Sequence, residues 1–196
     1  GAESEYDSYT EYLGIGSMEP DGSNSRLLVE STFDFWINPD FQILNDRIFL
    51  SGYSSEEGCY AIYSCDMDGD DMTADISINM SNASLFSDGT RLYISARVND
   101  KQGLYVHDPK SDTTSKLMSL ESKNNTNRML VGAKNGSVYV SEYKYNNTWT
   151  AANGKLYKID ASNKKKSLVS KFTNGYCDRI QYAGKFFVAY QFFNSY

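Results

Sequence analysis

The chain has 196 residues, a formal net charge of -6 and an aromatic content of 14%. This length is enough for one domain with a substantial core, and abundant aromatic residues suit packed β-strands. The net acidity argues against nucleic acid as a partner, because nucleic acid binds to a basic surface. Every apolar run is of strand length, so direct insertion into a membrane is not expected.

Residues 1–11 are acidic and small, and we interpret them as a linker or a remnant of expression. After them, one short phrase recurs four times: an apolar triplet, an acidic residue and a turn. Its acidic residue falls at Glu19, Asp66, Asp108 and Asp160, at intervals of 42 to 52 residues. A repeat of this length is typical of β-propeller blades.

A second apolar phrase runs in step with the first and always follows a polar or glycine-bearing turn. Its copies are Ile48–Leu50, Leu92–Ile94, Val138–Val140 and Phe186–Val188. A third phrase follows each acidic turn, and its weakest copy lies around 72–76. These patterns predict all-β units of four antiparallel strands, named a to d from the inside of the blade outwards.

The third unit shows the expected pattern most clearly. Its strands a to d are predicted around Ser84–Phe86, Arg91–Val98, Gly103–Asp108 and Ser115–Leu120. The aromatic and β-branched residues of these runs suit a pleated sheet that is packed between neighbours.

The ends of the domain, which we expect to span 12–196, each carry half a unit. Strands c and d are predicted within Tyr12–Val29, and strands a and b within Ile180–Phe193. Three whole units and two halves make four blades. One alternative is a closed four-blade ring in which the two halves pair, which would remove exposed strand edges. The other is a fragment of a larger propeller; a ring that is not closed would favour a second chain or self-association by strand addition.

The strand c phrase Leu156–Asp160 reads Leu-Tyr-Lys-Ile-Asp and resembles the blades of the TolB-like and low-density-lipoprotein-receptor (YWTD-type) propeller superfamily. The resemblance covers about 12–193, although the YWTD tetrapeptide itself is absent. It implies propeller architecture, with extracellular or cell-surface binding or scaffolding as the commonest use. Fold alone does not specify the ligand.

The residue types give little support for a nucleophilic catalytic site or a metal site. His107 is the only histidine, and its repeat equivalents, which include Cys65, indicate a packing position rather than a catalytic base. Three cysteines, Cys59, Cys65 and Cys177, do not indicate a disulfide framework. No catalytic residue and no cofactor is therefore assigned.

Alternating carboxylates at Asp66, Asp68 and Asp70 resemble a calcium loop, and calcium is the alternative interpretation of this segment. The distal acidic ligand of such a loop is missing, since Ser77 stands at its position. The repeat instead predicts an Asp-Gly hairpin turn between strands c and d.

The d-to-a and b-to-c connections of a propeller emerge at the same face. In this chain two of these connections, 31–40 and 143–154, are irregular and contain aromatic residues. Exposed aromatic side chains in loops suit carbohydrate stacking or contacts with a protein. The candidate ligand-binding residues are Trp36, Tyr53, Tyr145 and Trp149. Alternatively, the two tryptophans fill gaps between blades, because large aromatics are mostly buried.

These features favour a binding module for a protein, peptide or carbohydrate. One alternative is a carboxylate-dependent hydrolase or lyase, for which an inward-facing carboxylate pair of raised pKa would be evidence. Another is a structural domain of a larger surface protein.

Overall fold

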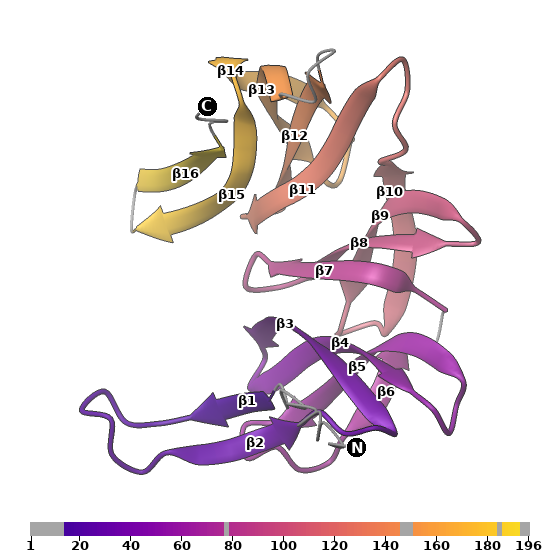
Figure 1. Ribbon diagram of the computed structural model, residues 1–196, viewed down its shortest axis with the longest axis vertical. Helices are drawn as coiled ribbons and strands as arrows, with labels where there is room; N and C mark the ends of the chain where they lie inside the picture. Colours follow the sequence, from indigo (N-terminus) through magenta and orange to yellow (C-terminus); the bar gives the residue numbers. More distant parts are fainter. Residues whose placement is uncertain (1–13, 77–78, 146–150, 184–185, 193–196) are drawn as a thin grey trace, which may run out of the picture.

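The computed structural model in Figure 1 describes residues 14–76, 79–145, 151–183 and 186–192. The expected linker, residues 1–11, lies outside this range. Every element of the described residues is a β-strand, as predicted, and none of these residues belongs to a helix that could span a membrane.

The strands have the following bounds: β1 (Gly14–Ser17), β2 (Arg26–Glu30), β3 (Phe35–Leu44), β4 (Arg47–Ser54), β5 (Cys59–Asp66), β6 (Thr73–Ile76), β7 (Ser81–Ser87), β8 (Leu92–Val98), β9 (Lys101–Asp108), β10 (Thr113–Ser119), β11 (Thr126–Lys134), β12 (Ser137–Tyr145), β13 (Ala151–Asp160), β14 (Lys166–Asn174), β15 (Tyr176–Ala183) and β16 (Phe186–Phe192).

Three antiparallel four-stranded sheets form in chain order: β3–β6 (blade two), β7–β10 (blade three) and β11–β14 (blade four). They are flanked by two-stranded sheets, β1–β2 (the N-terminal half-sheet) and β15–β16 (the C-terminal half-sheet). The prediction of half a unit, three whole units and half a unit is confirmed. In blade three, all four predicted strands agree with β7 to β10.

The seam expected for a closed four-blade ring is not formed. Within the described residues β1 pairs only with β2, and β16 only with β15. Figure 1 shows the sheets along an open arc, with the two half-sheets at its ends and β1–β2 apart from β16. The N-terminal half-sheet packs against blade two instead, where Ile15 and Val29 share a core with Leu50. At the inner side of the gap, Arg179 of β15 and Asp40 of β3 approach to 3.9 Å.

The core consists of apolar clusters between neighbouring sheets. Successive side chains of a strand point to opposite faces, so the Ile48–Leu50 phrase contributes to two clusters. Phe49 packs towards blade three, whereas Ile48 and Leu50 pack towards the N-terminal half-sheet. Burial on both faces explains why these strands are continuously apolar instead of alternating.

One equivalent position of the inner strand is buried in blades three and four but exposed in blade two, where the open arc leaves it uncovered. Phe41, Leu85 and Leu130 are cross-strand partners of the last residue in the second apolar phrase of blades two, three and four. Leu85 is 1% exposed and Leu130 4%, but Phe41 is 41% exposed. Blades three and four follow a complete sheet, whereas blade two follows only a half-sheet without inner strands. Ile43, two residues further along β3, is 52% exposed for the same reason.

Candidate functional site

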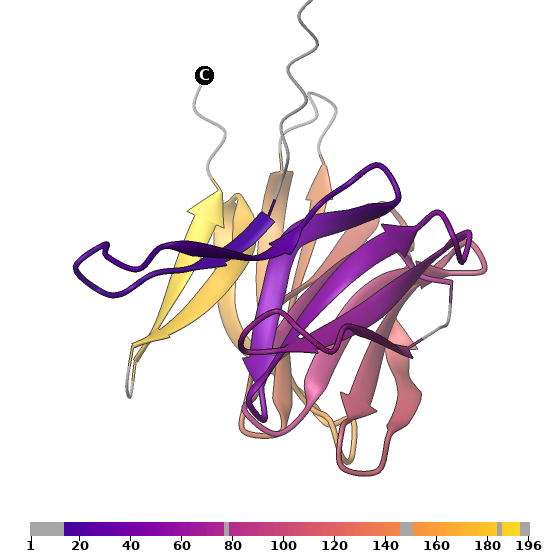
Figure 2. The ribbon, with the colours of Figure 1, turned by 90° about the horizontal axis from the view of Figure 1, so that it is seen from below.

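The blades have two unlike ends, which lie at the top and bottom of Figure 2. We call the upper one the aromatic end; it carries the β4–β5 and β12–β13 hairpins and the β2–β3 and β14–β15 connections. The opposite turn end carries the short a-to-b and c-to-d turns. Of the predicted binding residues, the three that the structure describes, Trp36, Tyr53 and Tyr145, belong to segments of the aromatic end.

In blade two, a row of aromatic side chains crosses three strands. Trp36 of β3 is the register partner of Tyr53 of β4, which in turn faces Tyr60 of β5. The ring centroids of Tyr53 and Tyr60 are 5.0 Å apart. Trp36 is 44% exposed and Phe33, just before β3, is 88% exposed. Trp36 is therefore not a buried plug, and the row presents aromatic surface to solvent.

Three tyrosines, two from β12 of blade four and one from β15 of the C-terminal half-sheet, gather beside the β12–β13 hairpin. The rings of Tyr143 and Tyr176 are stacked with centroids 4.0 Å apart, and Tyr145 meets the edge of Tyr143 at 5.5 Å. Burial, followed by the hydrogen bond with Tyr145, raises the pKa of Tyr143. Tyr145 itself remains 42% exposed. The group has a fixed inner pair and an exposed outer ring.

Local backbone geometry brings these rings together. The β12–β13 register shifts between Glu142 and Lys144, opposite Asn153, which has a left-handed φ of 55°. Gly154 follows, and a Cβ there would lie 2.3 Å from the carbonyl oxygen of Gly175. Only glycine lets the β14–β15 connection approach so closely, and this approach places Tyr176 over Tyr143.

A cavity of about 360 Å³ opens at this end of blade four. Its lining comes from three neighbouring strands and consists of polar residues and one tyrosine: Thr126, Glu142, Tyr143, Lys144, Asn153 and Lys155. A volume in this range fits a small ligand or part of a larger one.

Glu142 is the only acidic residue among the described residues of the lining, and two cationic side chains pair with it. Its Oε1 accepts from Arg128 Nε at 2.9 Å and from Lys166 Nζ at 2.8 Å. Burial opposes ionisation of this carboxyl, but the hydrogen bonds from Lys166 and Arg128 outweigh it and lower the pKa of Glu142. Lys166 Nζ also lies 3.6 Å from the ring centroid of Tyr157. Glu142 is thus held as a carboxylate within a cationic cluster.

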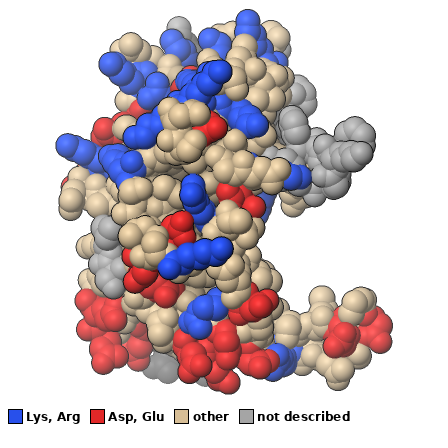
Figure 3. Space-filling view, turned by 180° about the vertical axis from the view of Figure 1, so that it is seen from behind, with Lys and Arg blue, Asp and Glu red and all other residues tan. Residues whose placement is uncertain are grey.

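Lys144 and Lys155 give the cavity an excess of positive charge, because neither forms an ion pair within the part of the chain that the structure describes. These two lysines are part of an uneven distribution of charge along the chain. Residues 1–98 contain 18 of the 25 Asp and Glu residues but only four of the 19 Lys and Arg residues. Figure 3 shows basic residues gathered over the upper part, where blade four lies, and acidic residues over the lower part.

None of the described cavity residues was among the predicted binding residues, although Tyr143, Lys144 and Asn153 belong to the irregular segment 143–154 that the sequence singled out. The charge argument considered the net charge of -6 and not its distribution along the chain. Counting charges separately in the two halves of the chain would have pointed to the C-terminal half. Of the predicted ligand-binding residues, Trp36 and Tyr53 are adjacent in blade two, Tyr145 belongs to the tyrosine group of blade four, and Trp149 lies outside the described residues.

The acidic segment suggested as a calcium alternative forms a hairpin turn. Gly69 N–H donates to the Asp66 carbonyl at 3.2 Å, and Asp66 Oδ1 accepts from the N–H groups of Asp68 and Asp70 at 2.9 and 2.8 Å. Asp68 forms an ion pair with Arg26. No group of three His, Cys, Asp or Glu side chains suited to a metal ion occurs among the described residues.

The histidine and two of the cysteines are packing residues, as the repeat predicted for His107 and Cys65. His107 is 2% exposed, its Nδ1 lies 3.0 Å from Thr114 Oγ1, and burial lowers its pKa. Cys65 is fully buried, and burial raises the pKa of Cys177 to about 11, far from that of a reactive thiol. All three cysteines are free.

Among the residues that the structure describes, carboxyl groups with perturbed pKa values do not form an acid–base pair. Asp88 and Glu142 are the partly buried ones, and hydrogen bonds lower the pKa of both despite burial. A general acid needs the opposite shift. Neither group therefore has the raised pKa that a general acid needs.

No family model and no curated protein matches the chain. Solved structures similar to it include a puromycin hydrolase (TM-score 0.60, 12% identity, 91% of this chain and 29% of that chain). An oligogalacturonate lyase in complex with manganese matches at TM-score 0.54 and 12% identity, over 81% of this chain and 42% of that chain. A nidogen/laminin complex matches at TM-score 0.52 and 11% identity, over 82% of this chain and 58% of that chain.

The chain thus spans about three fifths or less of the length of these structures. Identity at this level carries information about fold and not about chemistry. The likenesses agree with the resemblance of the sequence to TolB-like and YWTD-type blades, and they show that the chain has the β-propeller fold.

Proposed function

We propose that this chain is a carbohydrate-binding module that captures its ligand at the aromatic end of the blades. The observation that carries the proposal is the cavity of blade four beside the Tyr143, Tyr145 and Tyr176 rings. Sugar rings stack on exposed tyrosine and tryptophan faces, and their hydroxyl groups pair with polar side chains around them.

The geometry supports binding with little rearrangement. Tyr143 is held in place by its stack on Tyr176, so Tyr145 is presented on a supported surface. Trp36 and Tyr53, at the same end of blade two, provide a second aromatic surface for a longer chain. Rigid aromatic groups lose little conformational entropy when a ligand binds.

A protein partner is the second candidate, and the exposure of Phe33 favours it. An 88% exposed phenylalanine next to the half-exposed Trp36 resembles the aromatic anchors that dominate protein interfaces. The similar nidogen propeller is part of a complex with laminin, so a blade arrangement of this kind is compatible with protein binding.

An enzymatic function, the hydrolase or lyase alternative, has less support. The partly buried carboxyls with perturbed pKa values among the described residues, Asp88 and Glu142, are held ionised, so neither has the raised pKa of a general acid. The extracellular or cell-surface location implied by the blade resemblance is part of the proposal, as is the absence of nucleic acid among the partners.

A glycan array that carries neutral and acidic oligosaccharides tests the function. We expect the wild-type chain to bind a defined subset of sugars, and Tyr145→Ala to reduce that signal by about tenfold, because stacking on an exposed ring contributes roughly 1 kcal/mol or more. The matched control is Leu168→Ala, which removes a similarly exposed apolar side chain (48%) from the outer strand β14.

Failure of the wild type to bind any sugar would exclude carbohydrate binding. Equal losses from Tyr145→Ala and Leu168→Ala would show that the site lies elsewhere. Trp36→Ala separates the two aromatic surfaces: a loss restricted to longer oligosaccharides is expected if blade two extends the site of blade four.

A further inference from the structure

The charges around the cavity of blade four do not balance. One carboxylate, Glu142, already serves two cations, Arg128 and Lys166. Lys144 and Lys155 line the same cavity and form no ion pair within the described part of the chain. A ligand that enters the cavity therefore meets two lysines to which the described part of the chain provides no carboxylate partner.

These two lysines come from neighbouring strands that converge on the cavity. Lys155 of β13 is the register partner of Glu142, and Lys144 of β12 is the register partner of both Thr126 and Ala152. The register shift between Glu142 and Lys144 sets the two lysines on either side of Asn153. The two lysines therefore come from paired strands at the cavity and not from unrelated loops.

The lining also distinguishes a sugar from a peptide. It offers hydroxyl groups from Thr126 and Tyr143 and an amide from Asn153, and none of its described residues is an aliphatic one that could anchor a peptide side chain. Interfaces with peptides usually bury apolar anchors, whereas sugars present many hydroxyl groups and need polar partners.

The charge distribution of the molecule also favours an anionic ligand at this cavity. The cavity lies in the basic half of the chain, shown in the upper part of Figure 3, whereas the acidic residues gather on the blades furthest from it. Such an asymmetric field attracts an anion to the basic half although the molecule as a whole is negative.

We propose that the cavity of blade four binds an acidic oligosaccharide, with Lys144 and Lys155 pairing with the carboxylate of a uronic acid unit. This inference rests on the proposed carbohydrate-binding function and names the class of its ligand. This carboxylate accepts a charge-assisted hydrogen bond from each of the two lysines, while sugar hydroxyls meet Thr126, Asn153 and the carboxylate of Glu142.

Titration calorimetry with tetragalacturonate and with its fully methyl-esterified form tests the proposal, since esterification removes the charge but keeps the sugar and its hydroxyl groups. We expect the acidic form to bind at least about tenfold more tightly than the ester, with an affinity that falls as salt is raised. The double variant Lys144→Gln/Lys155→Gln is expected to lose at least about tenfold in affinity for the acid and little for the ester.

The matched control is Lys110→Gln/Lys165→Gln, which removes the same charge from c-to-d turns at the turn end. Both lysines are exposed there, and both turns keep their backbone hydrogen bonds. Equal losses of affinity in the two double variants would show that the overall charge of the molecule attracts the ligand, and would contradict the proposed site. Tighter or equal binding of the ester would overturn the acidic ligand but leave carbohydrate binding intact, whereas absence of binding by every sugar on the array contradicts the proposed function itself.

Discussion

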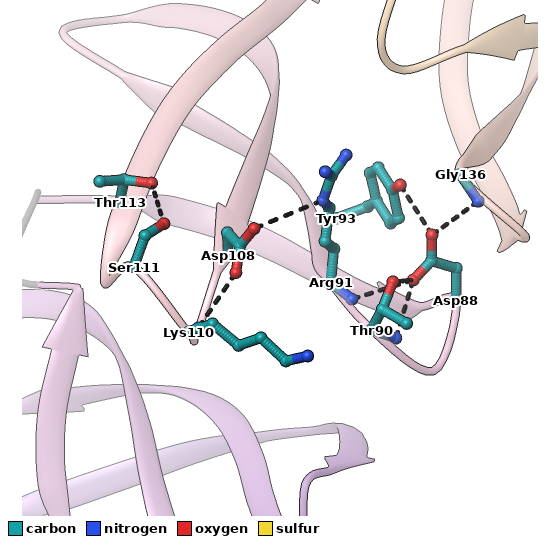
Figure 4. A network of polar contacts seen from close by, with 9 residues as sticks. All are labelled: Asp88, Thr90, Arg91, Tyr93, Asp108, Lys110, Ser111, Thr113 and Gly136. Atoms are coloured by element: carbon teal, nitrogen blue, oxygen red, sulfur yellow. Dashed lines mark hydrogen bonds and ion pairs between the residues drawn. The ribbon is translucent and has the colours of Figure 1, made fainter.

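The carboxylate of Asp88 in the β7–β8 turn accepts a hydrogen bond from the N–H of Gly136 in the β11–β12 turn, with Oδ2 and N 2.8 Å apart. Figure 4 shows that the same carboxylate also receives the Tyr93 hydroxyl, at 2.9 Å, and the backbone N–H of Thr90 and of Arg91. One side chain thus ties a turn of blade three to the matching turn of blade four.

Replacing Asp88 with Asn tests this link. The amide nitrogen cannot accept, so one set of donors loses its partner, and we expect a loss of about 1–3 kcal/mol in the free energy of unfolding. Chemical denaturation at pH 7 measures it. The matched control is Asp112→Asn, in an exposed turn where a left-handed φ of 48° suits either residue; its stability should be unchanged.

The same contact predicts a pH dependence. Burial opposes ionisation of Asp88, but the hydrogen bonds from Thr90, Arg91 and Gly136 lower its pKa below the ordinary 3.8. Because the folded-state pKa is the lower one, the stabilisation is complete above about 3.8 and is lost as the pH falls through the folded-state value. Wild-type stability should therefore fall more steeply than that of Asp88→Asn below this pH. Parallel curves would show that the link contributes nothing.

Gly154→Ala tests how the tyrosine group is built. The added Cβ would lie 2.3 Å from the carbonyl oxygen of Gly175, so the β14–β15 connection must move and take Tyr176 away from Tyr143. We expect a loss of about 1–3 kcal/mol and a changed near-ultraviolet circular dichroism spectrum of the tyrosines.

Gly58→Ala is the comparison for Gly154→Ala, because nothing lies within 4 Å of its Cβ position and only its φ of 63° is unfavourable. Its cost should be about 1 kcal/mol, without a change in the tyrosine spectrum. An unaltered spectrum in Gly154→Ala would contradict the assigned role of the close approach.

The repeat phrases predicted the strand order well because each phrase fixes the register and the buried faces of its strand. Leu85 and Leu130 could thus be placed in blade cores from the pattern alone. The same pattern could not predict that Phe41 would be exposed, since its burial depends on a neighbouring sheet and not on its own strand. The cavity lysines were missed for a related reason: net charge averages over two halves of opposite sign, and only the folded chain brings Lys144 and Lys155 to one cavity.

This difference between equivalent positions predicts unequal stability effects. Leu85→Ala removes a side chain that is 1% exposed and should cost about 2–5 kcal/mol. Phe41→Ala removes one that is 41% exposed and should cost about 1 kcal/mol or less at low protein concentration. Urea denaturation of both variants measures the difference. Equal costs would show that a further segment covers Phe41 in solution.

Self-association is the remaining prediction, and it follows from the same uncovered strip. β1 and β16 each leave one edge unpaired among the described residues, and Phe41 and Ile43 lie exposed on the inner strand between the half-sheets. Unpaired edges beside apolar surface promote strand addition from another chain. Sedimentation should therefore show a concentration-dependent increase in mass that Phe41→Asp suppresses. Leu168→Asp, at a 48% exposed position of β14, is the control and should leave association unchanged. A chain that stays monomeric at every concentration, or that responds equally to both variants, would show that these edges do not mediate contacts between copies.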